Sequence, residues 1–257
     1  MFYSIFYKAL SAKSPRFKIA SIFITLSCGI GSVDANTKIP SKTKCSKKTI
    51  SELISNCPQT PDWLKEARTN SETVSINKHK GSVIWHNGTW ENGSWIDGVW
   101  ESGTWKDGIW EKGSWKGGIW KRGTWKDGIW EKGTWEDGTW EDGTWRNGAW
   151  IKGTWIYGVW KGGRWYNGTW ENGSWEGGTW RKGAWIKGTW RKGTWKSGRW
   201  YNGTWIDGSW KNGIWRNGTW KNGIWKNGTW KNGTWETGRI FNNSNRKPIH
   251  TNKAPGS

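Results

Sequence analysis

Positively charged side chains recur at a fixed spacing in the second half of this 257-residue chain. Lysine or arginine stands directly after a tryptophan in five successive five-residue steps from Lys211 to Lys231. Because concentrated positive charge creates a field that attracts polyanions, we predict a polyanion-binding surface in this half. Its predicted members are Arg181, Lys182, Lys187, Arg191, Lys192, Lys211, Arg216, Lys221, Lys226 and Lys231.

Two tyrosines accompany arginines in the same half of the chain. Tyr166 follows Arg164 and Trp165, and Tyr201 stands in the same setting 35 residues later. Aromatic rings and guanidinium planes can stack on bases or on sugar rings, so we predict aromatic stacking at Tyr166 and Tyr201. The alternative interpretation is that the basic side chains only keep the protein in solution.

No group of residues suited to catalysis, metal binding or a phosphate-binding loop stands out. The three histidines, His79, His86 and His250, lie outside the repeat or at its edge. Glycine recurs with the repeat rather than in a phosphate loop, and a residue repeated throughout a chain cannot mark one catalytic centre. We therefore expect a protein that is not an enzyme, with no cofactor, no metal and no small-molecule substrate.

The element that must position the basic residues is a repeat of five residues. Tryptophan occupies every fifth position from Trp85 to Trp235, which accounts for 31 of the 32 tryptophans. A typical unit is Gly-Thr-Trp-Lys-Asn, and glycine precedes tryptophan by two places in every unit except the first, where Val83 stands. Thr, Ile, Ser or Val before the tryptophan favours strand, and Asn-Gly or Asp-Gly favours a turn. Each unit therefore predicts a short strand followed by a turn.

Two chain paths fit this unit. In the first, the turns all bend the same way and the chain forms a coil with Trp and Gly pointing inward, where Gly leaves room for Trp. In the second, the turns are hairpins and the chain is an antiparallel β-meander with all repeat tryptophans on one face. Such a face would be too apolar for a monomer, so the meander would need a second layer. We favour the coil and keep the meander as the alternative.

The unit Gly-Thr-Trp-Lys-Asn resembles, over residues 83 to 240, the repeat of the pentapeptide-repeat family. The resemblance implies an all-β solenoid, a right-handed quadrilateral β-helix with four units per coil. The chain differs from the family in having Trp where Leu or Phe is usual and Gly where Ala is usual, which leaves the number of units per coil open. Identical segments at 104–113 and 124–133 suit four units per coil, but similar segments at 145–175 and 180–210 do not.

Two further resemblances are weaker. Membrane-occupation repeats and choline-binding repeats share Gly-Thr-Trp and Trp-x-x-Gly fragments with this chain, and they would suit the meander. Some pentapeptide-repeat proteins inhibit topoisomerases through an acidic surface that mimics DNA. The basic repeat of this chain opposes that mechanism.

The sequence divides into four parts. Residues 1–35 predict a signal peptide, because basic residues precede an apolar run over 19–26 and small residues fit cleavage before Asn36. The apolar run is short for a membrane span. We therefore predict export, so that the protein is secreted, periplasmic or at the cell surface. An uncleaved anchor and a lipid on Cys28 are the alternatives.

Residues 36–80 predict a linker and a short helical cap. Thr49 and Glu52 form a capping-box pattern, and a second short helix is expected after Thr60. An even pair of cysteines in an exported chain predicts a disulfide between Cys45 and Cys57. Such a cap would cover the first coil of a solenoid over residues 81–240. Residues 241–257 predict a disordered basic tail, and the alternative for 36–80 is a disordered spacer with free thiols.

Charge is distributed unevenly along the repeat. Residues 85–145 hold 7 basic and 11 acidic residues, whereas residues 146–235 hold 16 basic and 3 acidic residues. We therefore predict an exported structural or adhesive solenoid that engages an anionic polymer or cell surface, meaning polysaccharide, lipid head groups or nucleic acid. The alternative is a self-assembling filament or matrix protein that uses Trp-rich or charge-complementary interfaces. A head-to-tail contact between the acidic and basic ends would give a homo-oligomer.

Overall fold

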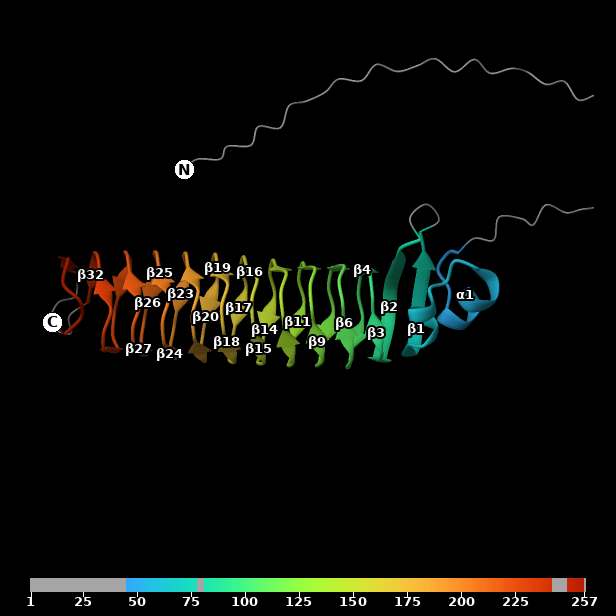
Figure 1. Cartoon of the computed structure of the whole chain (residues 1–257), viewed down its shortest axis with the longest axis horizontal. Coiled ribbons are helices and arrows are strands. Elements are labelled where there is room, and N and C mark those ends of the chain that lie inside the picture. Colours follow the sequence, from blue (N-terminus) through green and yellow to red (C-terminus); the bar gives the residue numbers. More distant parts are fainter. Residues whose placement is uncertain (1–44, 78–80, 242–248, 257) are drawn as a thin grey trace, which may run out of the picture. The chain divides into compact units, whose positions relative to one another are not determined.

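The structure is a computed structural model of the chain, and it describes residues 45–77, 81–241 and 249–256. The predicted signal peptide and the predicted linker up to residue 44 lie outside the described residues, as does His79. The described residues all belong to one unit, Lys42–Ser257. Its core is a parallel β-solenoid of about 11 turns, with two short helices at its N-terminal end (Figure 1). The all-β solenoid is therefore confirmed, and the repeat does not form an antiparallel meander.

The cap begins with two short helices. Helix α1 (Ile50–Asn56) starts at the predicted capping box, where the Glu52 N–H donates to Thr49 Oγ1 at 3.3 Å and the Thr49 N–H donates to Glu52 Oε2 at 3.0 Å. Helix α2 (Asp62–Lys65) is shorter than expected. A disulfide joins Cys45 to Cys57, with Cα atoms 5.5 Å apart. These bonds fix the first turn of α1 and tie together the chain segments on its two sides.

A nine-residue strand, β1 (Arg68–Ile76), completes the cap and was not anticipated from the sequence. It pairs antiparallel with β2 (Val83–Asn92), the first strand of the solenoid. Val74 and Ile76 of β1 are buried, and the Trp63 ring contacts Trp95 edge-on with centroids 5.1 Å apart. Together β1 and the helices cover the N-terminal end of the solenoid, where open strand edges would otherwise be exposed.

The repeat forms three columns of short parallel strands, which we call faces 1, 2 and 3. The long strand β2 opens faces 1 and 2. Face 1 continues through β4 (Gly98–Trp100), β7 (Ser114–Trp115), β10 (Ile129–Trp130), β13 (Thr144–Trp145), β16 (Val159–Trp160), β19 (Ser174–Trp175), β22 (Thr189–Trp190), β25 (Thr204–Trp205), β28 (Thr219–Trp220) and β31 (Thr234–Trp235). Face 2 continues through β5 (Thr104–Trp105), β8 (Ile119–Trp120), β11 (Thr134–Trp135), β14 (Ala149–Trp150), β17 (Arg164–Trp165), β20 (Thr179–Trp180), β23 (Thr194–Trp195), β26 (Ser209–Trp210), β29 (Ile224–Trp225) and β32 (Gly238–Ile240). Face 3 consists of β3 (Ser94–Trp95), β6 (Ile109–Trp110), β9 (Thr124–Trp125), β12 (Thr139–Trp140), β15 (Thr154–Trp155), β18 (Thr169–Trp170), β21 (Ala184–Trp185), β24 (Arg199–Trp200), β27 (Ile214–Trp215) and β30 (Thr229–Trp230).

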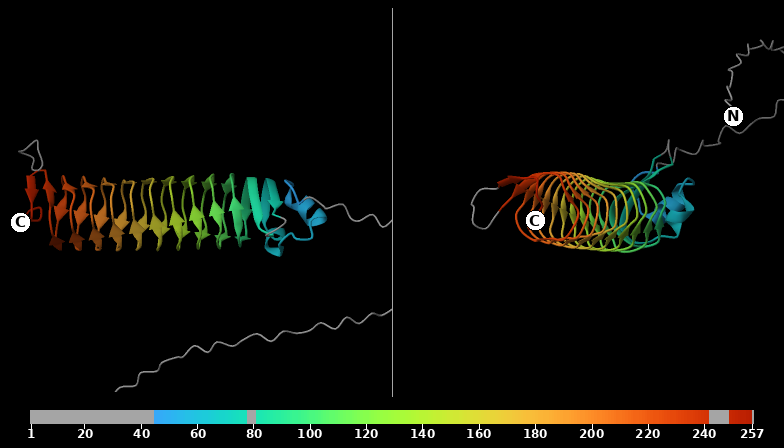
Figure 2. Two further views of the ribbon diagram at one scale, coloured as in Figure 1. Left: turned by 90° about the horizontal axis from the view of Figure 1, so that it is seen from above. Right: turned by 60° about the vertical axis from the view of Figure 1, so that its left-hand side comes forward.

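One coil contains three units, so the predicted quadrilateral coil of four units is wrong. Trp140 pairs with Trp125 on one side and with Trp155 on the other, which places residues 15 apart in sequence on adjacent coils. Figure 2 shows the successive coils overlying one another along the axis. The bulk of the indole explains the difference, because three columns of rings each touch both others and fill the interior. Four columns would leave opposite columns apart and the centre loosely packed.

The core is made of tryptophan rings. Rings on the same face stack with centroids 4.7 to 5.0 Å apart and planes within 7° of parallel. Rings of successive units meet edge-on, with centroids 5.6 to 6.1 Å apart. Every repeat tryptophan from Trp85 to Trp220 has no exposed surface. Each ring therefore contributes both apolar burial and aromatic contacts in favourable geometry.

The indole N–H groups are only partly satisfied. Six donate to a backbone carbonyl on the following coil, as Trp145 does to Gly162 O at 3.1 Å, and Trp235 donates to a carbonyl of the C-terminal tail. Among the described residues, 22 other buried indole nitrogens form no hydrogen bond. Because unpaired buried donors oppose folding, stability must come from ring burial and from the backbone ladders.

The repeat glycine is required by the backbone of the neighbouring coil. Gly118 has φ of 118°, and a Cβ there would overlap the carbonyl oxygen of Gly103 on the preceding coil. The close contact is thus between coils, whereas we expected glycine to make room for the tryptophan. The residue before the glycine stabilises the turn, since the Gly98 N–H donates to Asp97 Oδ1 at 2.7 Å and the Gly148 N–H donates to Asn147 Oδ1 at 2.8 Å.

The C-terminal end also differs from expectation. We predicted a disordered tail over 241–257, but β33 (Ile249–Thr251) pairs antiparallel with β32. The Trp235 indole N–H donates to Thr251 O at 3.0 Å, so this strand supplies acceptors to the last coil. Within the described ranges, no helix has the length and apolar character needed to cross a membrane.

Candidate functional site on the basic half

The three-unit coil distributes the predicted polyanion-binding residues over all three faces, and the structure does not gather them into one patch. The pairing register places Arg181, Lys182, Lys211 and Lys226 on face 2. It places Arg191, Lys192 and Lys221 on face 1, and Lys187, Arg216 and Lys231 on face 3.

Face 2 carries an unbroken row of four cations. Arg181, Lys196, Lys211 and Lys226 each follow the tryptophan of successive face-2 strands, and all four are exposed. The rings behind them are 4.8, 4.8 and 4.9 Å apart, so successive cations are separated by one coil. We call these four residues the cation ladder. Lys196 was missing from the predicted set, because its place in the row is visible only at a spacing of 15 residues.

The equivalent rows on the other two faces are interrupted. On face 1 the residue after each tryptophan runs Arg191, Ile206, Lys221 and Glu236. On face 3 it runs through Ile186 and Tyr201 before the two cations of the last two coils. Face 2 therefore offers the longest uncompensated line of positive charge.

In the N-terminal half, by contrast, charges neutralise one another from coil to coil. Eight ion pairs join residues 15 apart, with N···O distances from 2.8 to 4.0 Å. They are Glu91–Lys106, Asp97–Lys112, Glu101–Lys116, Asp107–Arg122, Glu111–Lys126, Lys121–Glu136, Glu131–Arg146 and Asp137–Lys152. No such pair occurs beyond Lys152 in the part of the chain that the structure describes. Each exposed pair contributes little stability, about 0.2–1 kcal/mol, but its acidic partner neutralises the positive charge that an anionic ligand would bind.

Three aromatic side chains in or next to the basic half lie under cations. The Arg181 guanidinium lies over the Tyr166 ring, 4.9 Å from its centroid, and Arg216 lies over Tyr201 at the same distance. At the other end of the ladder, Lys226 lies over Phe241 at 5.0 Å. The partner of each tyrosine is thus the arginine on the next coil, rather than the arginine that precedes it in sequence. On face 2 these contacts hold the first and last cations of the ladder in place.

A recess opens at the N-terminal end of the ladder. It has a volume of about 220 Å³ and is lined by Arg164, Tyr166, Thr179, Arg181 and Lys196. A larger hollow of about 510 Å³ lies farther towards the N-terminus, and its lining charges balance. That hollow is lined by Glu91, Asn92, Lys106, Asp107, Lys121, Arg122, Glu136, Asp137 and Lys152. The recess thus combines a concave shape with unpaired positive charge, and a hollow of about 450 Å³ at the C-terminal end of the ladder, lined in part by Lys226 and Lys253, does the same.

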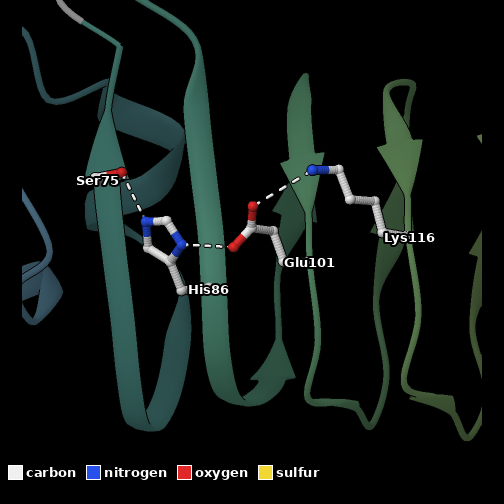
Figure 3. Close-up of polar contacts among 4 residues, drawn as sticks. All are labelled: Ser75, His86, Glu101 and Lys116. Atoms are coloured by element: carbon white, nitrogen blue, oxygen red, sulfur yellow. Dashed lines mark hydrogen bonds and ion pairs between the residues drawn. The ribbon is translucent and has the colours of Figure 1, made fainter.

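A second polar group lies where the cap meets the first coils (Figure 3). Ser75 Oγ lies 2.8 Å from His86 Nε2, and His86 Nδ1 lies 2.7 Å from Glu101 Oε2. Lys116 Nζ lies 3.4 Å from the other Glu101 oxygen. The His86 ring thus lies between the Ser75 hydroxyl and the Glu101 carboxylate, with one ring nitrogen facing each. The chain of contacts joins β1 of the cap to strands of face 1.

The order serine, histidine, carboxylate is that of a hydrolytic triad, but the setting differs. A nucleophilic serine is presented on a sharp turn beside backbone N–H groups that stabilise the oxyanion. Ser75 lies inside β1, whose backbone pairs with β2 opposite Ile84. The group therefore ties the cap to the solenoid, and we do not assign it a catalytic role.

This group predicts a pH dependence of stability. The hydrogen bond from His86 lowers the pKa of Glu101, burial opposes the shift, and Lys116 adds to it. A carboxylate with a lowered pKa stabilises the fold above its unfolded pKa, and the contribution is lost as pH falls through the folded pKa. We expect Glu101→Gln to lower the melting temperature at neutral pH, and the difference from wild type to vanish in acid. Glu141→Gln is the control, since Glu141 forms no ion pair with a described residue; an equal effect would contradict the assignment.

Comparison with protein-family models, curated proteins and solved structures finds no match. Within residues 45–77, 81–241 and 249–256, no group of three or more His, Cys, Asp or Glu side chains is placed to hold a metal ion. His250 lies at the C-terminal end, where Nε2 is 3.2 Å from Thr237 Oγ1.

Proposed function

We propose that the protein is an exported, non-enzymatic β-solenoid with a structural or adhesive role, and that its basic half binds an anionic extracellular polymer. The observation that supports this most is the cation ladder, which has no acidic partner. In the N-terminal half the same coil places acidic residues beside its cations. The fold would therefore also accommodate acidic residues beside the ladder, and their absence there is a property of the sequence.

The four cations of the ladder repel one another, and an anionic ligand would relieve this repulsion. Unit charges about 4.8 Å apart repel by an amount on the order of 1 kcal/mol per pair in water. A polyanion that lies along the row replaces this repulsion with attraction and also releases its own counterions. The rigid stack behind the ladder holds the backbone in place, so binding has to order only the cationic side chains.

Export is a further part of the proposal. It rests on the predicted signal over residues 1–35, and the Cys45–Cys57 disulfide is in keeping with an oxidising compartment. The relation to the pentapeptide-repeat family is also proposed. The five-residue unit and its large inward-facing centre are shared, whereas the coil has three units.

The alternative of self-assembly receives less support. The tryptophans from Trp85 to Trp220 are buried within one chain, so they offer no Trp-rich interface. The N-terminal strand edges are covered by β1 and the helices, which disfavours strand pairing between copies at that end. Eight of the eleven acidic residues of 85–145, which would attract a neighbour's basic half, are paired along their own faces.

Retention on immobilised heparin, a linear sulfated polyanion, tests the proposal. We expect wild type to be retained and to elute as salt rises. Replacing the four ladder cations with Gln should make the dependence of log K on log salt shallower by roughly 3. The matched control replaces Lys106, Lys116, Lys121 and Lys126 with Gln, which removes the same charge from residues already paired. Absence of retention, or equal loss in both variants, would contradict the proposal.

A further inference from the structure

We infer that face 2 binds a linear acidic polysaccharide with one carboxylate on each sugar residue, which lies along the cation ladder and is anchored in the recess at its N-terminal end. This inference rests on the proposed function and specifies the ligand for the same surface. Three features of face 2 lead to it: the spacing of the cations, the lining of the recess and the occupied faces of its aromatic rings.

The spacing of the ladder matches a sugar chain better than a nucleic acid. Successive cations are separated by one coil, and the rings behind them are 4.8 to 4.9 Å apart. This is comparable to the length of one sugar residue in an extended chain, so a polymer with a carboxylate on every residue places about one acidic sugar beside each cation. Phosphates along one strand of duplex DNA rise by about 3.4 Å each along the helix axis and wind around it, so they do not follow a straight row with one charge per coil.

The recess has the donors that a single acidic sugar requires. Arg164 and Arg181 provide guanidinium groups, which bind carboxylates through paired hydrogen bonds. Thr179 provides a hydroxyl group that can bond to sugar hydroxyls, and Lys196 continues into the ladder. The Tyr166 ring holds the Arg181 guanidinium in place. The volume of about 220 Å³ lies below the 300–1,000 Å³ typical of drug-sized ligands, which suits one ring of a chain.

The aromatic rings argue against single-stranded nucleic acid. Binding of that kind relies on bases stacking upon successive free aromatic faces. On face 2 the described aromatic side chains outside the core are Tyr166 and Phe241, at opposite ends of the ladder, and each has a cation over its ring. Between them the residues before each tryptophan are Thr179, Thr194, Ser209 and Ile224, which provide mainly hydroxyl groups for a polar chain.

Calorimetric titration with three probes tests the ligand class. The probes are an oligomer of 1,4-linked galacturonic acid long enough to span the ladder, the same oligomer with methylated carboxylates, and oligothymidylate of equal charge. We expect the galacturonate oligomer to bind at least about tenfold more tightly than oligothymidylate, and the methylated oligomer not to bind. Tighter binding of oligothymidylate, or binding of the methylated oligomer, would overturn the inference.

Paired variants test the location. Arg164→Gln with Arg181→Gln should weaken galacturonate binding by about tenfold or more, whereas Arg191→Gln with Lys221→Gln, on face 1, removes the same charge and should change it less than about twofold. All four side chains are on the surface, so the fold should persist and can be checked by circular dichroism. Equal weakening by both pairs would overturn this inference while heparin retention would still support polyanion binding. Loss of retention on heparin by wild type would reject both.

Discussion

Replacing Trp155 with alanine is expected to destabilise the solenoid by about 4 kcal/mol. Trp155 is completely buried and stacks between Trp140 and Trp170, with centroid distances of 4.8 and 4.7 Å. It also meets Trp150 and Trp160 edge-on at 6.0 Å. The substitution removes these contacts and leaves a cavity that rigid neighbouring coils cannot fill.

The matched control is Trp230→Ala on the same face. Trp230 belongs to the last coil of face 3, is partly exposed, and stacks only on Trp215 among the described residues, at 4.9 Å. We expect its loss to cost less than half as much. Denaturant unfolding followed by circular dichroism gives both values, and nearest-neighbour coupling between coils should be included in the fit. Equal costs for the two variants would contradict a core in which each ring is stabilised by rings on both sides.

Alanine at Gly118 is expected to destabilise the fold by about 3 kcal/mol. Its φ of 118° is unfavourable for any residue with a Cβ, and the added atom would overlap the Gly103 carbonyl oxygen. That oxygen accepts the ladder hydrogen bond from the Ile119 N–H at 2.9 Å. The coils must therefore separate locally and weaken their backbone pairing.

The adjacent Gly117 provides the control. A Cβ there would lie 3.7 Å from the Glu101 carbonyl oxygen and 3.8 Å from Lys132 Cε, which are ordinary contacts. We expect Gly117→Ala to change the free energy of unfolding by less than about 0.5 kcal/mol. The two variants differ in position by one residue, so chemical denaturation of both isolates the effect of the coil contact. Similar stabilities would show that the coils are not as closely apposed as the structure has them.

Much of the fold follows from the five-residue unit. A tryptophan at every fifth place, a strand-forming residue before it and a turn after it predict a coil with a tryptophan core, and the structure confirms this. The capping-box pattern at Thr49 and Glu52 likewise marks the start of α1. These features are local, because each depends on residues within one unit or one helical turn.

The size of the coil is not a local property, and it was predicted wrongly. Repeated segments at a spacing of 20 residues favoured four units, but any unit can follow any other, so sequence identity carries no information on the coil. Opposite charges at a fixed spacing do indicate the number of units per coil. Glu91 and Lys106, or Asp137 and Lys152, attract each other only when residues 15 apart lie on adjacent coils. The same spacing would have revealed the cation ladder and Lys196.

Strand β1 of the cap and strand β33 of the tail were missed for a related reason. Strand β1 and strand β33 lie outside the repeat and pair antiparallel with the solenoid ends. Their residues show weak alternation, and what makes them strands is the open backbone edge that each one covers. Such pairing depends on contacts between separate segments, which the five-residue pattern does not encode.

Cysteine pairs test the three-unit coil and the cation ladder in one measurement. Lys196→Cys with Lys211→Cys places two thiols on adjacent coils of face 2, at strand spacing that permits a disulfide. Lys196→Cys with Arg216→Cys places them on different faces, although a four-unit coil would make them neighbours. After mild oxidation, mass spectrometry of peptides should find the 196–211 crosslink and not the 196–216 crosslink. The reverse result would contradict the three-unit coil and, with it, the continuous row of cations from which the function is argued.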